Sequence, residues 1–249
     1  MRHNPSAVKT FAESLPAAYR AGFDWAAIAE HTKLAAGRRP GHPAIGSFYA
    51  SRLPGHALCI IADDRPGLLA LISSALIDER LDVIAAEAYT RPLPNQTREA
   101  VDLFWVQRLS PGDASAPLTG ELILHLERTL DELLNGSEQP HSTRLPTQRP
   151  PAVPGAVVET TVRFIENRNG TLSTLEVEAG DRAGLLLVLS KALYEQRVQI
   201  VSSSIRSMNG RVKDRFEVTE LDDTPIRPDR RLLVQVAVLS AIQESFGQK

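Results

Sequence analysis

The sequence predicts a duplicated α+β fold, in which two similar units each combine an antiparallel sheet with helices on one face. The first observation behind this prediction is a repeated hexapeptide: Asp64-Arg65-Pro66-Gly67-Leu68-Leu69 returns later as Asp181-Arg182-Ala183-Gly184-Leu185-Leu186. A second pattern, Asp-x-Phe-x-Val, occurs at Asp102 to Val106 and at Asp214 to Val218. The third is that both copies show the same order of strand-like and helix-like periods. Two patterns repeated in the same order indicate a duplicated domain.

Apolar residues set the elements expected within each copy. Strands are predicted at Ala57–Ala62, Val83–Thr90 and Ala100–Gln107, and at Thr174–Ala179, Gln199–Ser207 and Val212–Leu221. Helices are predicted where apolar residues recur at helical spacing: Leu68, Ile72, Ala75 and Leu76; Leu185, Leu189, Ala192 and Leu193; Leu122, Leu126, Leu130 and Leu133; and Leu232, Val236, Leu239 and Ile242. The first copy carries a longer loop, placed at Arg91–Glu99, whereas Asn209-Gly210 predicts a tight hairpin turn.

Each unit needs a fourth strand to complete its sheet, and a strand ahead of the first one can supply it. Val157–Ile165, followed by Asn169-Gly170, reads as the first arm of a hairpin, and Ala44–Ser51 stands in the same position in the first copy. We therefore expect the order ββαββα in both units. The alternative is that Val157–Ile165 closes the sheet of the first copy.

The chain divides into four segments. Residues 1–42 form a helical N-terminal segment, 43–135 the first unit, 136–155 a Pro-rich linker, and 156–249 the second unit. Within the first segment, Phe11–Gly37 reads as helical, with Asp24 as a helix cap. Its apolar face is predicted to consist of Leu15, Tyr19, Phe23, Trp25, Ile28 and Leu34, and to pack on one of the sheets.

Composition excludes several classes of protein. The 249 residues carry a net charge of −2 and contain one cysteine, Cys59, so a disulfide framework and a zinc site built on several thiolates are excluded. The near-neutral charge argues against nucleic acid as a partner, and no apolar stretch is long enough to span a membrane. Without an evident secretory signal, a cytoplasmic protein is expected.

The search for catalytic and metal-binding motifs indicates no enzyme, no metal site and no cofactor. The six histidines are scattered, with no His-Asp pair and no metal-binding spacing. His31 and His125 are predicted to lie in helices as surface or partly packed residues. Cys59 lies in an apolar run without a basic neighbour, so it reads as a small core residue.

The repeated turn is the candidate for chemistry. A strand ends, the chain turns, and a helix begins at Gly67 or Gly184, where free amides and the helix dipole suit a carboxylate. The neighbouring Asp64 or Asp181 can bind an ammonium group, so the turn suits a free amino acid. The competing interpretation is purely structural: the aspartate caps the helix, the arginine is solvated and the glycine relieves a tight corner.

These turns and the strands around them resemble the ACT domain, a ferredoxin-like regulatory module that in many proteins binds an amino acid. Val162 to Asn167, Thr174 to Val177 and the second hexapeptide resemble the C-terminal tandem ACT region of PII uridylyltransferase/uridylyl-removing enzymes. Leu15-Pro16, Tyr19, Phe23-Asp24, Ile28-Ala29 and His31 are similar to the segment that precedes it. The resemblance implies a ligand site formed by both hexapeptides and by the start of the second strand of a neighbouring unit, here Asp82, Gln199 and Ile200, with glutamine as the first ligand to test.

Asp82 departs from this pattern, because an ionised carboxylate cannot donate a hydrogen bond to the ligand's carboxylate. The nucleotidyltransferase and hydrolase domains of that family cannot be found in the sequence, so the resemblance implies the sensing part alone. We expect ACT units to pair within the chain or in a homodimer, and a protein partner to read the signal. A second interpretation is an assembly module that has lost its ligand. A third, RNA binding through Phe104 and Phe216, lacks a basic platform.

Overall fold

The computed structural model describes residues 4–49, 53, 55–109, 116–136, 159–165 and 172–247. The helices are α1 (Pro5–Glu13), α2 (Ala17–Gly22), α3 (Trp25–Gly37), α4 (Leu68–Asp78), α5 (Gly120–Asn135), α6 (Leu185–Glu195) and α7 (Pro228–Phe246). The strands are β1 (Ala44–Phe48), β2 (His56–Asp63), β3 (Leu81–Pro92), β4 (Arg98–Arg108), β5 (Thr161–Ile165), β6 (Ser173–Gly180), β7 (Val198–Met208) and β8 (Arg211–Glu220).

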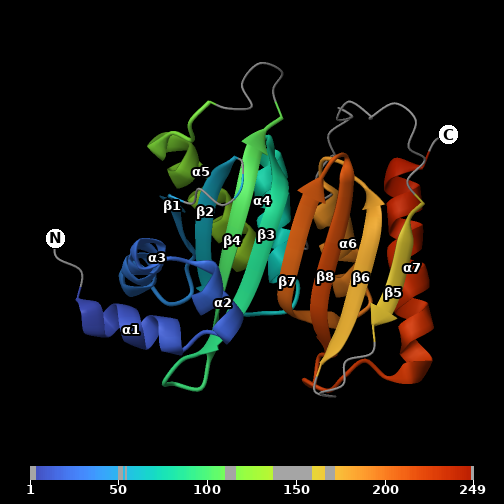
Figure 1. Cartoon of the computed structure of the whole chain (residues 1–249), viewed down its shortest axis with the longest axis horizontal. Coiled ribbons are helices and arrows are strands. Elements are labelled where there is room, and N and C mark those ends of the chain that lie inside the picture. Colours follow the sequence, from blue (N-terminus) through green and yellow to red (C-terminus); the bar gives the residue numbers. More distant parts are fainter. Residues whose placement is uncertain are drawn as a thin grey trace.

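All eight strands form one antiparallel sheet in the order β1-β2-β4-β3-β7-β8-β6-β5 (Figure 1). The first half contributes β1 to β4 and the second half contributes β5 to β8. The halves meet where Ala85–Ala88 of β3 pair with 203–206 of β7. The predicted α+β class is confirmed, and both halves follow the order strand, strand, helix, strand, strand, helix.

The strand ahead of each unit pairs with the strand that follows it. β1 pairs with β2, and β5 pairs with β6. The alternative, in which Val157–Ile165 closes the sheet of the first copy, is therefore wrong. The predicted Asn169-Gly170 turn and nearly all of the 136–155 linker lie outside the described residues. The second hairpin turn is as expected: Asn209 and Gly210 both have positive φ, 55° and 74°, which a tight hairpin requires.

Helices α4 to α7 cover one face of the sheet with a continuous apolar core. Phe104 and Phe216 lie wholly inside this core, so neither can stack on a nucleic-acid base. The apolar face predicted for α7 is wrong in part, because Leu232 and Val236 are exposed whereas Val234, Val238 and Ile242 are buried. Leu232 and Val236 lie one helical turn apart, and so do Val234 and Val238. Helical spacing alone therefore does not show which of these two rows faces the sheet.

The two edge strands are each protected by a side chain from a helix. Glu127 of α5 accepts a hydrogen bond from the Ile45 amide at 2.9 Å, and Gln235 of α7 donates to the Val162 carbonyl at 2.8 Å. Open strand edges favour pairing with other chains. These contacts occupy outward-facing backbone groups at both ends of the sheet.

The N-terminal segment is three helices rather than one, because the chain breaks before Pro16 and again at Asp24. Asp24 caps α3 as predicted, accepting a hydrogen bond from the Ala27 amide at 2.8 Å. The segment packs on the face of the first half that is opposite α4 and α5, with Tyr19 wholly buried. Trp25, predicted to join this apolar face, is 52% exposed.

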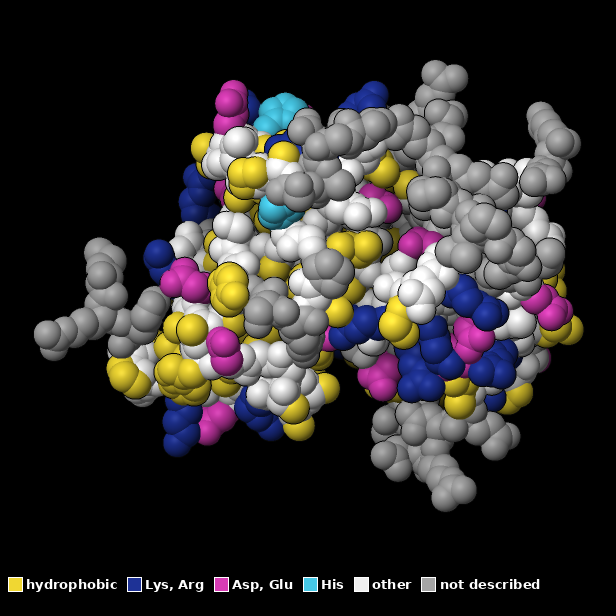
Figure 2. Space-filling view, turned by 45° about the horizontal axis from the view of Figure 1, so that its top comes forward, with side chains coloured by type: hydrophobic (Ala, Val, Ile, Leu, Met, Phe, Trp, Pro, Cys, Tyr) yellow, Lys and Arg dark blue, Asp and Glu magenta, His cyan; other side chains and the backbone are white. Residues whose placement is uncertain are grey.

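The same face of the second half is charged. Arg163, Lys213 and Arg215 surround the carboxylate of Glu176, which is 1% exposed. Figure 2 shows Lys and Arg side chains gathered on this side of the molecule. The duplication therefore preserved the helix-covered face and let the opposite faces diverge.

The β3–β4 hairpin, the longer of the two, holds the N-terminal helices on the sheet through a network of ion pairs. The loop predicted at Arg91–Glu99 is shorter than expected, since β3 runs to Pro92 and β4 resumes at Arg98. Glu99, 3% exposed, binds Arg91 at 2.6 Å and Arg38, at the end of α3, at 2.9 Å. Arg38 also reaches Asp63 at 2.8 Å. One buried carboxylate therefore links α3 to two strands of the sheet.

Replacing Glu99 with alanine is expected to lower the free energy of unfolding by about 3 kcal/mol, because it leaves Arg38 and Arg91 without their shared buried partner. Urea unfolding followed by circular dichroism measures the change. Glu13→Ala is the control, since the Lys9–Glu13 pair is 70% and 60% exposed and contributes less than about 1 kcal/mol. Equal effects of the two substitutions would contradict the importance of the network.

Candidate junction sites

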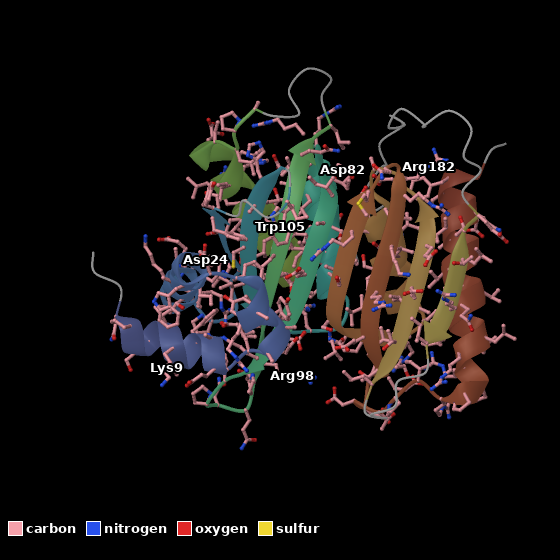
Figure 3. The ribbon with its side chains drawn as sticks, in the orientation of Figure 1. Lys9, Asp24, Asp82, Arg98, Trp105 and Arg182 are labelled. Atoms are coloured by element: carbon pink, nitrogen blue, oxygen red, sulfur yellow. The ribbon has the colours of Figure 1, made fainter. Side chains whose placement is uncertain are left out.

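The repeated turns lie at opposite ends of the β3–β7 junction. Because β3 and β7 are antiparallel, the start of each strand lies beside the turn of the other half. The structure therefore brings the Asp64–Leu69 turn together with Gln199 and Ile200, and the Asp181–Leu186 turn together with Asp82. We call these the first and second junction sites. Figure 3 shows Asp82 and Arg182 at the same end of the sheet, on the two sides of the junction, with Arg98 at the other end.

A β-bulge lies beside Asp82 in β3, and another lies beside Gln199 in β7. The register of β3 shifts between Val83 and Ala85, and that of β7 shifts between Ile200 and Ser202. Bulges bend a strand and re-aim the side chains beside them. The two strands therefore use the same local distortion beside Asp82 and beside Gln199.

In the first junction site the amide of Gln199 meets the carboxylate of Asp64. The Gln199 Nε2 atom donates to Asp64 Oδ1 at 3.4 Å and to the Ile200 carbonyl at 3.3 Å. Its Oε1 atom is buried and has no hydrogen-bond partner among the described residues. Burial raises the pKa of Asp64, and the guanidinium of Arg98, at 3.5 Å, partly offsets this shift.

In the second junction site a carboxylate replaces that amide. Asp82, 6% exposed, accepts a long hydrogen bond of 3.4 Å from the Gly184 amide. Burial, together with the charge of Asp181, raises the pKa of Asp82 to about 6. Asp181 itself accepts a hydrogen bond from the Ser207 hydroxyl. This site is more acidic than the first, because a carboxylate stands where the first site has Gln199.

The helix starts differ from the sequence-based expectation. Neither Asp64 nor Asp181 caps its helix; the N-caps are Gly67 and Gly184, with φ of 81° and 80°, a left-handed conformation that favours glycine. The Leu68 amide donates to the Arg65 carbonyl, and the Leu185 amide donates to the Arg182 carbonyl. The chain therefore satisfies some of the amides that were expected to face a guest.

Little space remains inside either site. The first encloses a cavity of about 30 Å³ and the second one of about 20 Å³, which is room for about one water molecule each. The ring of Tyr194, from α6, covers the first helix start: a Cβ atom on Gly67 would lie 2.7 Å from Tyr194 Cδ2. The Tyr194 side chain is itself 39% exposed. Both sites are filled mainly by the protein's own side chains.

Two buried aspartates belong to the sites although the sequence analysis did not assign them there. Asp102 lines the first cavity and Asp214 lines the second. Burial raises the pKa of Asp102 well above its usual range, and burial raises that of Asp214 to about 8, with Asp181 adding to the shift. Both residues open the repeated Asp-x-Phe-x-Val pattern. In both copies the aspartate lies two residues before a phenylalanine that is predicted to be on the same face of the strand, and this repeated position was the signal that would have found them.

The remaining predicted site residues fall into two groups. Arg65, Gly67, Leu68 and Leu69 line the first cavity, and Arg182, Gly184, Leu185 and Leu186 line the second. Pro66 and Ala183 line neither cavity, so they shape the turns from outside. Arg65 donates to the Leu134 carbonyl at 2.8 Å, which ties the first turn to the end of α5.

The four histidines among the described residues and the cysteine line neither junction site. Cys59 is buried, as predicted, and His31 is fully buried rather than at the surface or partly packed. A His-Asp pair, which the sequence did not indicate, joins His42 and Asp131 at 2.7 Å. Among the described residues no group of three histidine, cysteine or acidic side chains is arranged to hold a metal ion. No described helix combines the length and apolar character needed to traverse a bilayer.

Known proteins provide an independent comparison. The chain is 30% identical over 197 residues to the bifunctional uridylyltransferase/uridylyl-removing enzyme of Streptomyces coelicolor, covering 77% of this chain and 22% of that protein. The enzymes of the same name from Rhodospirillum rubrum and Azospirillum brasilense are 28% and 26% identical, over 76% and 86% of this chain and 20% and 23% of theirs. This chain is similar to part of those enzymes. It spans about a fifth of the length of these curated relatives. No family model matches it.

Asp214 allows a test of the buried charge. Its folded pKa of about 8 lies above the ordinary value of 3.8, so the unfolded chain releases this proton first as the pH rises. The free energy of unfolding then falls by about 1.4 kcal/mol per pH unit between roughly pH 4 and 8. Asp214→Asn removes this loss, and urea unfolding should show its advantage over the unsubstituted chain growing by about 2–4 kcal/mol from pH 5 to pH 8.

Asp229→Asn is the matched control, because the side chain of Asp229 is 73% exposed. Its effect is expected to stay constant between the two pH values. A constant difference for Asp214→Asn as well would show that the carboxyl group is ionised in the folded protein at neutral pH.

Proposed function

We propose that this chain is a non-catalytic, cytoplasmic regulatory module that senses a free amino acid at the junction between two ACT units. In each unit the strand that usually comes last precedes the first, and the units pair side by side through β3 and β7. Similarity to part of the bifunctional uridylyltransferase/uridylyl-removing enzymes supports a regulatory role. Any uridylyl transfer or removal that it controls would require catalytic domains outside the region described.

The first junction site carries the proposal. Gln199 brings a buried Oε1 atom without a hydrogen-bond partner among the described residues to the turn that holds Asp64. The ammonium group of a guest amino acid can donate to Gln199 Oε1 and to the carboxylate of Asp64. The carboxylate of the guest is then directed toward the start of α4, where the helix dipole favours negative charge. A zwitterion matches this pair of charges better than a simple anion or cation does.

Binding requires the site to widen, since an amino acid is several times larger than the cavity of about 30 Å³. Tyr194 is the group to move, because its ring covers Gly67 and is already half-exposed. Tyr194 lies on α6, which packs against α4 across the junction and against α7. A guest that displaces this ring would therefore change the packing between the two halves, and a protein partner would read that change.

The second junction site is expected to bind no amino acid. Asp82 already occupies the Gly184 amide where a guest carboxylate would bind, and Asp181 and Asp214 line the same cavity. An ionised Asp82 repels a guest carboxylate, whereas Asp214, with its pKa of about 8, keeps its proton at neutral pH. One amino acid per chain is therefore the expected stoichiometry.

A thermal-shift panel of the twenty amino acids, with glutamine first, tests the proposal. A ligand at 100 times its dissociation constant should stabilise the fold by about 2.7 kcal/mol. Gln199→Asp gives the first site the residue of the second, so it should abolish the shift. Tyr194→Ala removes the covering ring, so it should preserve or strengthen binding.

Asp82→Gln is the reciprocal control, because it gives the second site the residue of the first. It should leave binding at the first site intact, and calorimetry should then report either one or two amino acids per chain. Loss of the shift in Asp82→Gln but not in Gln199→Asp would place the ligand at the wrong end of the junction. No shift with any amino acid would overturn the sensing role.

A second candidate function is an assembly module without a ligand. The closed junction favours it, since Asp82 and Tyr194 occupy the two helix starts in place of a guest. Light scattering distinguishes the candidates: an assembly module forms dimers or partner complexes whose stability is unaffected by amino acids. In that case Gln199→Asp and Tyr194→Ala leave assembly unchanged.

A further inference from the structure

The second half of the sheet presents a charged surface on the side opposite α6 and α7. Side chains alternate between the two faces of a strand. Phe164, Leu175 and Val212 pack in or against the core under the helices, so the charged residues that alternate with such positions face the other way. We call this surface the cationic face, and its members are Arg163 of β5, Glu176 and Glu178 of β6, and Arg211, Lys213 and Arg215 of β8.

The negative and positive charges of the cationic face lie at different depths. Glu176 is 1% exposed, whereas Arg163, Lys213 and Arg215, which all bind it, are 59%, 52% and 57% exposed. Glu178, 35% exposed, shares Lys213 at 2.8 Å and Arg163 at 3.7 Å. The carboxylates are therefore the more buried groups, and the positive charge points outward.

Arg211 adds a fourth cation at the start of β8. It is exposed and makes no ion pair with any described residue. Four cations and two carboxylates give this face a positive charge, in a chain whose net charge is −2. Figure 2 shows these Lys and Arg side chains gathered at the surface. Arg211, Lys213 and Arg215 are alternate residues of β8, so their positions repeat every 7 Å or so, about two residues of strand.

No described segment covers the cationic face, whereas α1 to α3 cover the same side of the first half (Figure 1). A hollow of about 550 Å³ separates α2 from the cationic face. Ser202 and Ser204 of β7 line it together with Arg215 and Glu217. The small hydroxyl side chains leave room beside Arg215, and the surface offers hydrogen bonds and charge rather than apolar area.

We propose that the cationic face is a docking surface for an acidic segment of a partner protein, which lies extended along β8 with its carboxylates on Arg211, Lys213 and Arg215. An extended chain with an acidic residue at every second position repeats at the same spacing of about 7 Å. Complementary charge of this kind governs mainly which partner binds and how fast. The proposal does not depend on amino-acid binding at the junction, so the two can fail separately.

A protein segment suits this face better than a nucleic acid does. It can place a neutral residue opposite Glu178 and Glu217, whereas every unit of a nucleic acid carries a negative charge. Stacking on aromatic side chains supports the binding of single strands. The only aromatic residue of β8, Phe216, is buried on the other face.

A fluorescein-labelled peptide of six Glu-Ser repeats is the probe, and fluorescence anisotropy with the full chain measures its dissociation constant. Raising the salt concentration from about 50 to about 200 mM should weaken binding several-fold, because salt screens exposed charges. A peptide of six Gln-Ser repeats should not bind.

Arg211→Gln should weaken binding about twofold to fivefold without disturbing the ion pairs of Glu176. Arg211→Gln combined with Lys213→Gln should weaken it by about tenfold, since Arg163 and Arg215 still hold Glu176. Arg227→Gln is the matched control, because this arginine is 66% exposed at the start of α7, outside the cationic face. It should leave binding unchanged, and urea unfolding confirms that each variant is folded.

Three results would overturn the proposal. One is the absence of salt-dependent binding, or equal weakening by Arg227→Gln and Arg211→Gln. Another is equally tight binding of an oligodeoxynucleotide of the same charge, which would assign the face to nucleic acid. The third is a dimer, detected by light scattering, that dissociates in the double variant, since a second copy of the chain would then occupy the face.

Discussion

The pairing of β3 with β7 is the interaction on which the rest of the structure depends. Four residues on each strand join the two halves, and the ion pair between Glu87 and Arg206 spans the join. Without it, each half would be a four-stranded sheet with a long inner strand exposed along one edge. Helices α4 and α6 pack over the same line, so the apolar core is continuous from one half to the other. The duplication therefore produced one body with an internal symmetry.

This pairing also determines where the functional groups lie. Because the central strands run antiparallel, the turn of one half reaches the strand start of the other at each end of the junction. Each junction site is therefore made from both halves, and the β-bulges beside Asp82 and Gln199 occur in both central strands. A molecule bound at either site would therefore contact both halves at once.

The sequence predicted the repeat and the order of strands and helices within each half, and the resemblance to ACT domains implied that Gln199 lies near a turn of the neighbouring unit. The predictions were wrong where the burial or role of a residue depends on contacts between different helices and strands. Leu232 and Val236 have helical spacing, but only the packed sheet determines that Val234 and Val238 face inward. His31 was predicted to be a surface or partly packed residue, and its full burial depends on Tyr19, which lies on another helix. Tyr194 gave no local signal, since its role over Gly67 arises only when the halves meet. Asp102 and Asp214 were visible in the repeated pattern, but burial is what alters their chemistry.

The two junction sites are not equivalent, because one carries Gln199 at the position where the other carries Asp82. A duplicated unit begins with two equal sites, and equal sites respond together. Here one site presents an amide with an unpartnered oxygen, whereas the other presents a carboxylate held on its own glycine amide. The second contact closes that end of the junction without a guest and makes its strength depend on the proton of Asp82. In the proposed sensor a guest therefore enters at one end of the junction only, and any change that it causes starts from that end.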